Sequence, residues 1–363
     1  MHITWLELRD FRSYEALRFE PDQTVNILVG DNGQGKTSVL EAIGYLGTTK
    51  SLRGVADEAL IREGASSAVI RGSFDGRASE TVIECEIPRE GRRKILVNGK
   101  RPARMRDVLT TVPVIAFLPD DLDVIKRGSA VRRDYLDDLA ARLWPQAAAF
   151  QTDYDRALRQ RNALLRQEGR AADPVTLDVW DERLAIAGAQ VLQHRRAVAT
   201  MLQSHLEDSY LVVGGSGALR WSYRSTWGSD GVMDDDGLVG AFVASLGARR
   251  AKELEIRSTT VGPHRDEPEL MLDGRNARSK ASQGEQRTIA LALRIGAYRL
   301  IEEVRNQTPI LLLDDVFSEL DPSRAARVLD LMPTGQVFVT TAREDEVPIR
   351  GRRWSVRDGK VSP

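Results

Sequence analysis

Residues 30–43 read GDNGQGKTSVLEAI, and this stretch decides how the first part of the chain folds. Its first eight letters match G-x-x-x-x-G-K-T, the pattern of a phosphate-binding loop. A continuous apolar run, ILV at 27–29, precedes the loop and is typical of a strand buried on both faces. Apolar residues then recur at helical spacing, at Val39, Leu40, Ile43 and Leu46. The stretch therefore predicts a strand, a loop that holds phosphates and a helix.

The residue types of the loop suit a nucleotide. Glycines let backbone N–H groups surround phosphate oxygens, and the start of the helix adds its positive end. Lys36 can reach the β- and γ-phosphates, and Thr37 can ligate Mg²⁺. The residues expected to bind the nucleotide are Gly30, Asp31, Asn32, Gly33, Gln34, Gly35, Lys36, Thr37 and Ser38. The alternative, a glycine-rich turn without a ligand, is disfavoured by the complete pattern.

A second apolar run, ILLL at 310–313, ends in Asp314 and Asp315. The carboxyl ends of parallel strands face the ligand crevice of such a sheet. Asp314 is expected to hold Mg²⁺, and Asp315 to orient or activate the attacking water. The predicted catalytic residues are therefore Asp315, Lys36 and Asp314. Either aspartate alone could instead cap a following helix.

The stretch SQGEQ at 282–286 has the pattern of a capping box, with Ser282 as N-cap and Glu285 three residues later. A capped helix start with exposed N–H groups also attracts anions. In a chain that already has a phosphate-binding loop, a second such site suggests the γ-phosphate of a nucleotide held by another subunit.

Other patterns outline the remaining elements. We expect strands at 3–8, 15–19 and 24–29, a β-meander at 68–98 that turns at Asn98-Gly99, and a strand at 337–341. Residues 130–209 are expected to be helical, with breaks at Pro145, Gly169 and Pro174 that exclude a long coiled coil. A helix is expected after Pro322 and a terminal hairpin at 354–361.

Composition excludes some classes of protein. Cys85 is the only cysteine of the 363 residues, so an intrachain disulfide is excluded and a cytoplasmic location is the default. No apolar run approaches the length of a membrane span.

The net charge of −1 means that a nucleic-acid partner needs a local basic face. Residues 86–106 hold eight basic and two acidic residues, and the candidate DNA contacts there are Arg92, Arg93, Lys94, Lys100 and Arg101. The alternative is a solvated basic loop.

SQGEQR at 282–287 resembles the signature motif of ABC-type ATPases in the form of the SMC-like DNA repair branch, and SELD at 318–321 resembles their D-loop. Within that branch the chain is similar to the RecF family of recombination mediators. The matching stretches cover essentially the whole chain, and they include LELRDFRSY at 6–14, VNGKR at 97–101, VGPHRD at 261–266 and LLLDDVFSELD at 311–321.

The resemblance implies an α/β fold: an ABC-type ATPase head with parallel and antiparallel sheets and an inserted, mainly helical arm. The implied domains are an N-terminal lobe at 1–119, the arm at 120–255 and a C-terminal lobe at 256–363. ATP and Mg²⁺ are the implied ligands, and an ATP-dependent head-to-head homodimer is the implied assembly. In that dimer Ser282, Gln283, Gly284 and Glu285 of one copy close on the nucleotide of the other, and Arg12 contacts the phosphates.

Two departures from the usual ABC pattern affect the expected rate. Asp315 stands where most of these ATPases have Glu, so we expect slow hydrolysis. Val339-Thr340-Thr341 stands where many have a His that senses the γ-phosphate. A Thr hydroxyl can contact phosphate or water, but it cannot act as a cationic sensor.

The resemblance further implies a cytoplasmic, nucleoid-associated role in DNA repair. It implies binding to double-stranded DNA or single-strand/double-strand junctions and help in loading RecA together with RecR and RecO. Three rivals are weighed against it. A P-loop GTPase should carry N-K-x-D, which is absent. A transporter subunit would lack the long insertion and VGPHRD. A DNA tether with a vestigial site is disfavoured by the intact Lys36, Thr37, Asp314 and Asp315.

Overall fold

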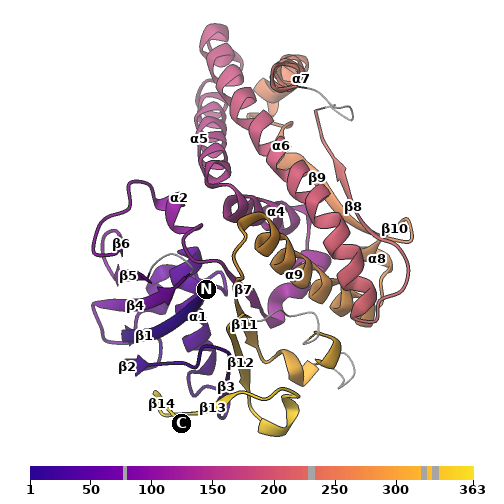
Figure 1. Ribbon diagram of the computed structural model, residues 1–363. Coiled ribbons are helices and arrows are strands. Elements are labelled where there is room, and N and C mark those ends of the chain that lie inside the picture. The colour runs from indigo at the N-terminus through magenta and orange to yellow at the C-terminus, as the bar shows by residue number, and fades with distance from the viewer. Residues whose placement is uncertain (77–79, 228–233, 320–324, 329–334) are drawn as a thin grey trace. The chain divides into compact units, whose positions relative to one another are not determined.

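A computed structural model describes residues 1–76, 80–227, 234–319, 325–328 and 335–363 (Figure 1). The chain divides into two compact units. The first unit combines residues 1–122, 208–216 and 287–363, and the second combines 123–207 and 217–286. This division differs from the predicted one, because 208–216 group with the first unit and 256–286 with the second. For 256–286 the reason is strand pairing: the strand at 267–272 pairs with the strand at 219–224.

A six-stranded sheet lies in the first unit, in the order β14-β13-β3-β12-β11-β7. Its strands are β3 (Val25–Val29), β7 (Val114–Phe117), β11 (Ile310–Asp314), β12 (Val337–Thr341), β13 (Arg352–Arg357) and β14 (Lys360–Ser362). All neighbours are parallel except β13 and β14. Every residue of β11 and β12 is buried, as expected for apolar runs covered on both faces.

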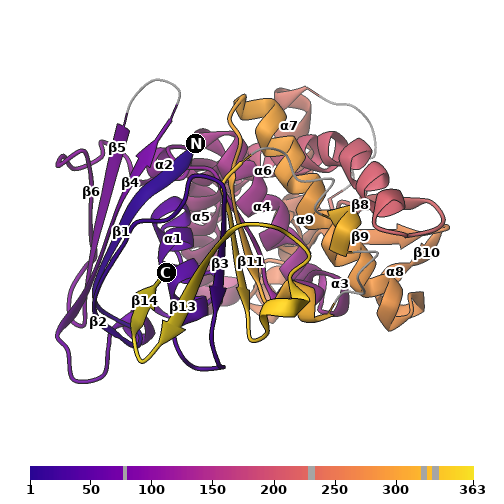
Figure 2. The same ribbon diagram turned by 60° about the horizontal axis from the view of Figure 1, so that its bottom comes forward.

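The second sheet of this unit is antiparallel, in the order β2-β1-β4-β5-β6. It comprises β1 (His2–Phe11), β2 (Tyr14–Phe19), β4 (Ser67–Asp75), β5 (Glu80–Pro88) and β6 (Lys94–Val97). The predicted meander and its turn are confirmed, with positive φ at Asn98 (51°) and Gly99 (72°). Helix α1 (Lys36–Thr48) contacts strands of both sheets and is buried along most of its length (Figure 2). Apolar side chains of both sheets and α1 form one core.

The second unit is mainly helical and carries a small antiparallel sheet. Its helices are α3 (Asp123–Lys126), α4 (Ser129–Leu143), α5 (Pro145–Glu168), α6 (Pro174–Val212), α7 (Asp235–Ile256) and α8 (Ala277–Lys280), where α6 extends past residue 207 into the first unit. The sheet joins β8 (Leu219–Arg224), β9 (Glu267–Leu272) and β10 (Arg275–Asn276). The predicted breaks are confirmed: Pro145 begins α5, Gly169 ends it and Pro174 begins α6. Proline fits a first helical turn, where its missing N–H costs nothing.

The described chain further contains helices α2 and α9, helical residues 325–328 and several 3₁₀ turns. The named elements are α2 (Met105–Val108), α9 (Gln283–Arg305) and the turns η1 (Asp57–Leu60), η2 (Pro119–Leu122), η3 (Gly169–Ala171), η4 (Pro263–Arg265), η5 (Val316–Glu319) and η6 (Glu344–Glu346). Residues 320–324, where the end of the predicted D-loop and the start of the helix after Pro322 fall, lie outside the described residues. Within the described ranges, no helix is long and apolar enough to cross a membrane.

The stretch VGPHRD lies in a polar network of the second unit. Tyr154 Oη and His264 Nδ1 are 2.6 Å apart. Asp266 is fully buried and accepts hydrogen bonds from the Tyr223 hydroxyl (3.0 Å) and the Thr226 N–H (2.9 Å). Burial lowers the pKa of His264 to about 4, because the charged imidazolium is poorly solvated there. The stretch therefore stabilises the unit through buried hydrogen bonds.

Candidate functional site

The predicted phosphate-binding loop connects β3 to α1. Asp31, Asn32 and Gly33 are exposed at its tip, whereas Lys36 is only 7% exposed. Lys36 Nζ donates hydrogen bonds to the carbonyls of Gly30 and Asp31. Burial lowers the pKa of Lys36, and the nearby carboxylates of Asp315, Asp314 and Asp31 oppose that shift. Carbonyl oxygens thus hold the Lys36 ammonium group at the loop. Phosphate oxygens can take their place as hydrogen-bond acceptors.

Glycine is required at two positions of the loop by close approach. A Cβ on Gly30 would lie 2.2 Å from the carbonyl oxygen of Val356 in β13. A Cβ on Gly35 would lie 2.8 Å from the Tyr14 hydroxyl, and the φ of Gly35, 107°, also disfavours any side chain. The Tyr14 hydroxyl donates to the Gly35 carbonyl. The loop is therefore held against both sheets of the first unit.

The terminal hairpin of β13 and β14 also contacts the phosphate-binding loop. Its predicted Asp-Gly turn is confirmed, with positive φ at Asp358 (50°) and Gly359 (68°). The Asp358 N–H donates to Gln34 Oε1 over 2.7 Å. A hollow of about 610 Å³ lies beside the loop and is lined by Gly30, Asp31 and Gln34 together with residues of β13 and the turn. Sequence reasoning found the hairpin but not this contact.

The acidic pair ends β11 next to the start of α1. Asp314 is 4% exposed, and its Oδ1 accepts hydrogen bonds from the Thr37 hydroxyl (2.7 Å) and the Thr340 hydroxyl (2.8 Å). Asp315 is half-buried with φ 54°, a left-handed conformation that is uncommon for a non-glycine residue. Its Oδ1 is buried, and no hydrogen-bond partner for it was found among the described residues. The structure thus brings the predicted metal ligands, Thr37 and Asp314, into direct contact.

These side chains fit a magnesium ion bound with a nucleotide. A hydroxyl and a carboxylate from two elements meet at 2.7 Å, and oxygen donors are the ligands that Mg²⁺ prefers. The buried Oδ1 of Asp315, which has no hydrogen-bond partner in the described part of the chain, adds a second carboxylate beside them. A buried acceptor without a donor is rare in a folded protein and is typical of a site that binds something.

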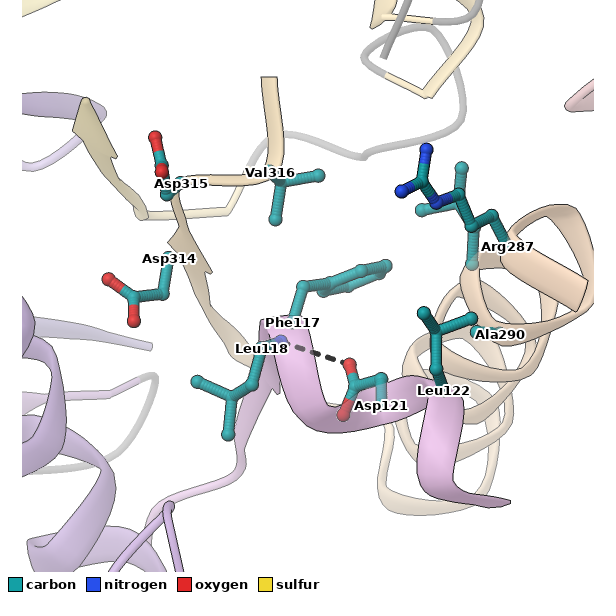
Figure 3. A pocket seen from close by; sticks show the side chains of 10 residues that line it. Phe117, Leu118, Asp121, Leu122, Arg287, Ala290, Asp314, Asp315 and Val316 are labelled. Carbon is teal, nitrogen blue, oxygen red and sulfur yellow. Dashed lines mark hydrogen bonds between the residues drawn. The ribbon is translucent and has the colours of Figure 1, made fainter. Parts of the chain in front are cut away.

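A cavity of about 70 Å³ lies beside the acidic pair, and Figure 3 shows its lining. Leu118 and Asp121 follow β7, and the side chains of α9 lie opposite them. Asp121 Oδ2 accepts from the Leu118 N–H over 3.0 Å, and Asp121 Oδ1 forms an ion pair with Arg294 of α9. The segment after β7 is therefore tied to α9 within the first unit.

The predicted capping box at the start of α9 is confirmed. The Ser282 N–H donates to Glu285 Oε2 over 2.7 Å, and the Glu285 N–H donates to Ser282 Oγ over 3.3 Å. The hydrogen bonds from Ser282 lower the pKa of Glu285. Ser282, Gln283 and Gly284 are exposed. The first turn of this helix therefore presents a capped N-terminus to solvent.

Arg12 has a partner within the chain. Its guanidinium forms a bidentate ion pair with Glu41 of α1 (2.8 and 3.1 Å) and donates to the carbonyl of Ala59. Glu41 is 2% exposed and also accepts from the Ser51 hydroxyl. The contact between Arg12 and nucleotide phosphates stays a prediction, because the structure directs this side chain to α1.

The basic hairpin divides into exposed and engaged residues. Arg92, Lys94, Lys100 and Arg101 are exposed, and Lys94 forms a surface ion pair with Glu86 (3.0 Å). Arg93 is different. Its Nη1 donates to the Thr49 carbonyl (2.7 Å), the Tyr45 hydroxyl (3.1 Å) and Asp57 (3.2 Å). Arg93 therefore fastens the hairpin to the end of α1, and its contact with DNA stays a prediction. Local charge density could not reveal this.

Comparison with known proteins supplies the family. The model of the RecF/RecN/SMC N-terminal domain matches residues 2–354. The DNA replication and repair protein RecF of Acidothermus cellulolyticus is 40% identical over 369 residues, which cover 99% of each chain. That of Frankia alni is 41% identical over 375 residues, again 99% of each chain. The chain belongs to the RecF family.

Solved structures agree with this family. The recombination mediator protein RecF, solved with ATP in the RecFOR pathway, matches with a TM-score of 0.93 at 28% identity, over 99% of this chain and 97% of that one. An Smc head bound to the C-winged helix domain of ScpA matches with a TM-score of 0.56 at 18% identity, over 99% and 96% of the chains, which shows the shared fold. The predicted fold class, an α/β ATPase head of the ABC and SMC type, is confirmed.

Proposed function

We propose that this chain is an ATP-driven switch of recombinational DNA repair. ATP binds at residues 30–38, two copies join head to head around it, and slow hydrolysis separates them. The observation that carries the proposal is the bond between Thr37 and Asp314, which joins the phosphate-binding loop to the acidic pair. The ATP in the solved structure of a RecF relative supports the choice of nucleotide.

Each residue of the site has a role in this scheme. Lys36 exchanges its carbonyl partners for the β- and γ-phosphates, and backbone N–H groups of residues 31–36 surround the phosphate oxygens. Thr37 and Asp314 hold Mg²⁺, which neutralises charge on those oxygens. Asp315 orients a water and accepts its proton as the water oxygen bonds to the γ-phosphorus and the bond to ADP breaks. Its side chain is one methylene shorter than Glu, so turnover is slow.

The second half of each site comes from the partner copy. The exposed, capped start of α9 supplies N–H groups and a positive helix end for a γ-phosphate. Ser282, Gln283, Gly284 and Glu285 of one copy close on the nucleotide of the other. An isologous dimer of this kind contains two such sites. ATP favours the dimer because both surfaces contact it, and hydrolysis removes that contact.

Light scattering with and without ATP and Mg²⁺ tests the switch. Wild type should change from monomer to dimer when both are added. Ser282→Arg should bind ATP and stay monomeric, because the large cation obstructs the helix start. Ser279→Arg is the matched control, since it adds the same side chain at an exposed position three residues earlier, and it should dimerise like wild type. A dimer of Ser282→Arg would refute the role of the partner's helix.

We further propose that the protein binds duplex DNA or single-strand/double-strand junctions through the exposed basic residues Arg92, Lys94, Lys100 and Arg101. Reversing the charge at Arg92, Lys100 and Arg101 should weaken binding. Each lost phosphate contact reduces the slope of log K against log salt by about 0.9. The same change at the exposed Arg156, Arg159 and Arg170 of the second unit is the control. Unchanged affinity of the hairpin variant would exclude this surface.

The place of the switch in repair follows from its relatives. Structures of RecF relatives belong to the RecFOR pathway. We therefore infer that the dimer on DNA binds RecR and, with RecO, promotes loading of RecA in the cytoplasm at the nucleoid. Pull-down of purified RecR by DNA-bound protein, with ATP and without nucleotide, tests this step. Equal or absent capture in both states would contradict an ATP-dependent partnership.

A further inference from the structure

Thr340 lies between the two carboxylate residues. It sits in β12, in register with Asp314 of the neighbouring parallel strand β11, and is 1% exposed. Its Oγ1 is 2.8 Å from Asp314 Oδ1 and 2.9 Å from the backbone N of Asp315. One buried hydroxyl therefore touches both residues that the proposed hydrolysis needs.

The directions of these hydrogen bonds are fixed by the atoms involved. A backbone N–H can only donate, so the Thr340 oxygen accepts from Asp315. A hydroxyl carries one hydrogen, which Thr340 donates to the carboxylate of Asp314. The Thr37 hydroxyl donates to the same Oδ1 over 2.7 Å. Asp314 is thereby held by two donors in one rotamer, next to the start of α1.

The backbone of Asp315 has the conformation that most needs support. Its φ of 54° lies in the left-handed region, which costs on the order of 1–3 kcal/mol for a residue with a side chain and persists only where surrounding contacts hold it. The N–H of Asp315 donates a hydrogen bond to the Thr340 hydroxyl over 2.9 Å. Because of this conformation, the Asp315 side chain leaves the strand with a buried Oδ1 that has no hydrogen-bond partner among the described residues.

We propose that Thr340 is a positioning residue for hydrolysis. Its hydroxyl holds the carboxylate of Asp314 and the left-handed backbone of Asp315 in one arrangement, so that the Oδ1 of Asp315 meets the attacking water. Thr340 acts through these two aspartates. The inference rests on the proposed ATPase function, but the two hydrogen bonds of Thr340 can be tested without nucleotide.

The nucleotide-free test is hydrogen exchange at the Asp315 amide, followed by NMR in three variants. Thr340→Val keeps the shape and removes the hydroxyl, so the amide should exchange about ten-fold faster or more, as expected for a lost hydrogen bond. Thr340→Ser keeps the hydroxyl and should exchange like wild type. Thr48→Val is the control, because it removes another buried hydroxyl of the first unit, which bonds the Gly44 and Lys50 carbonyls. Wild-type exchange in Thr340→Val would overturn the proposal.

ATP binding and hydrolysis provide a second measurement. A purely structural role of Thr340 would not slow hydrolysis while leaving ATP affinity unchanged. Thr340→Val should bind ATP with a Kd within about three-fold of wild type and hydrolyse it about ten- to a hundred-fold more slowly. Thr340→Ser should recover most of the rate. Equal turnover in Thr340→Val, or an equal loss in Thr48→Val, would overturn the role in hydrolysis. If wild type does not hydrolyse ATP at all, the proposed function fails, while the exchange experiment still decides whether Thr340 holds Asp315.

Discussion

Replacing Arg93 by Ala should destabilise the first unit, although Arg93 lies in a basic hairpin. Its bonds to the Thr49 carbonyl and the Tyr45 hydroxyl are each worth about 1 kcal/mol. The ion pair with Asp57 is about one-third exposed on both sides, so it adds less than about 1 kcal/mol. The total loss is about 2–3 kcal/mol. For a unit of this size, that lowers Tm by about 5–10 °C.

Arg92→Ala is the matched variant, since the neighbouring side chain is exposed and its removal should change stability by less than about 0.5 kcal/mol. Thermal unfolding followed by circular dichroism measures the stability of both variants. Fluorescence anisotropy with duplex DNA at several salt concentrations measures their DNA binding. Arg92→Ala should reduce the salt slope of binding and leave Tm unchanged. A stable Arg93→Ala protein that has lost DNA binding would refute the structural role assigned to Arg93.

Three other substitutions test separate parts of the account. Asp315→Asn should bind ATP and accumulate as dimer while hydrolysis falls about a hundred-fold or more, and normal turnover would remove Asp315 from its role. His264 has a pKa of about 4 in the folded protein and about 6.5 in the unfolded chain, so the free energy of unfolding should fall as pH drops from 6.5 to 4. In urea unfolding, His264→Gln should lose less stability over this pH range than wild type. An equal loss in both proteins would contradict this role of His264. Gly30→Ala should abolish ATP binding in calorimetry, because its Cβ would lie 2.2 Å from the Val356 carbonyl oxygen. Gly240→Ala should bind ATP normally, because its Cβ would meet no atom of the described residues within 4 Å.

Local patterns predicted those parts of the site that are contiguous in sequence. The loop at 30–37 is set by its glycines between an apolar strand and a helix, and the apolar run before Asp314 places that carboxylate at a strand end. The capping box at 282–285 depends only on residues three positions apart. In each case the residues that determine the geometry are neighbours along the chain, so spacing carries the information.

Contacts between distant residues could not be read in this way. Gln34 meets Asp358 across 324 positions, and Thr340 meets Asp315 across 25. Both contacts depend on which strands become neighbours and in what register, and no local spacing fixes that. Arg93 shows a related limit: charge density marks a basic hairpin, but only the hydrogen bonds to the end of α1 distinguish Arg93 from its exposed neighbours.

Each ATP site is proposed to combine the loop of one copy with the α9 start of another, and a mixture of two inactive variants tests this composite site. Lys36→Ala lacks the loop cation and Ser282→Arg lacks a usable helix start. In a mixed dimer one site combines the intact loop of the second variant with the intact helix start of the first. Each variant alone should hydrolyse no ATP, and an equimolar mixture should recover up to about half of the wild-type rate, because each mixed dimer holds one intact site of two. A mixture that stays inactive, with both variants folded, would contradict the account.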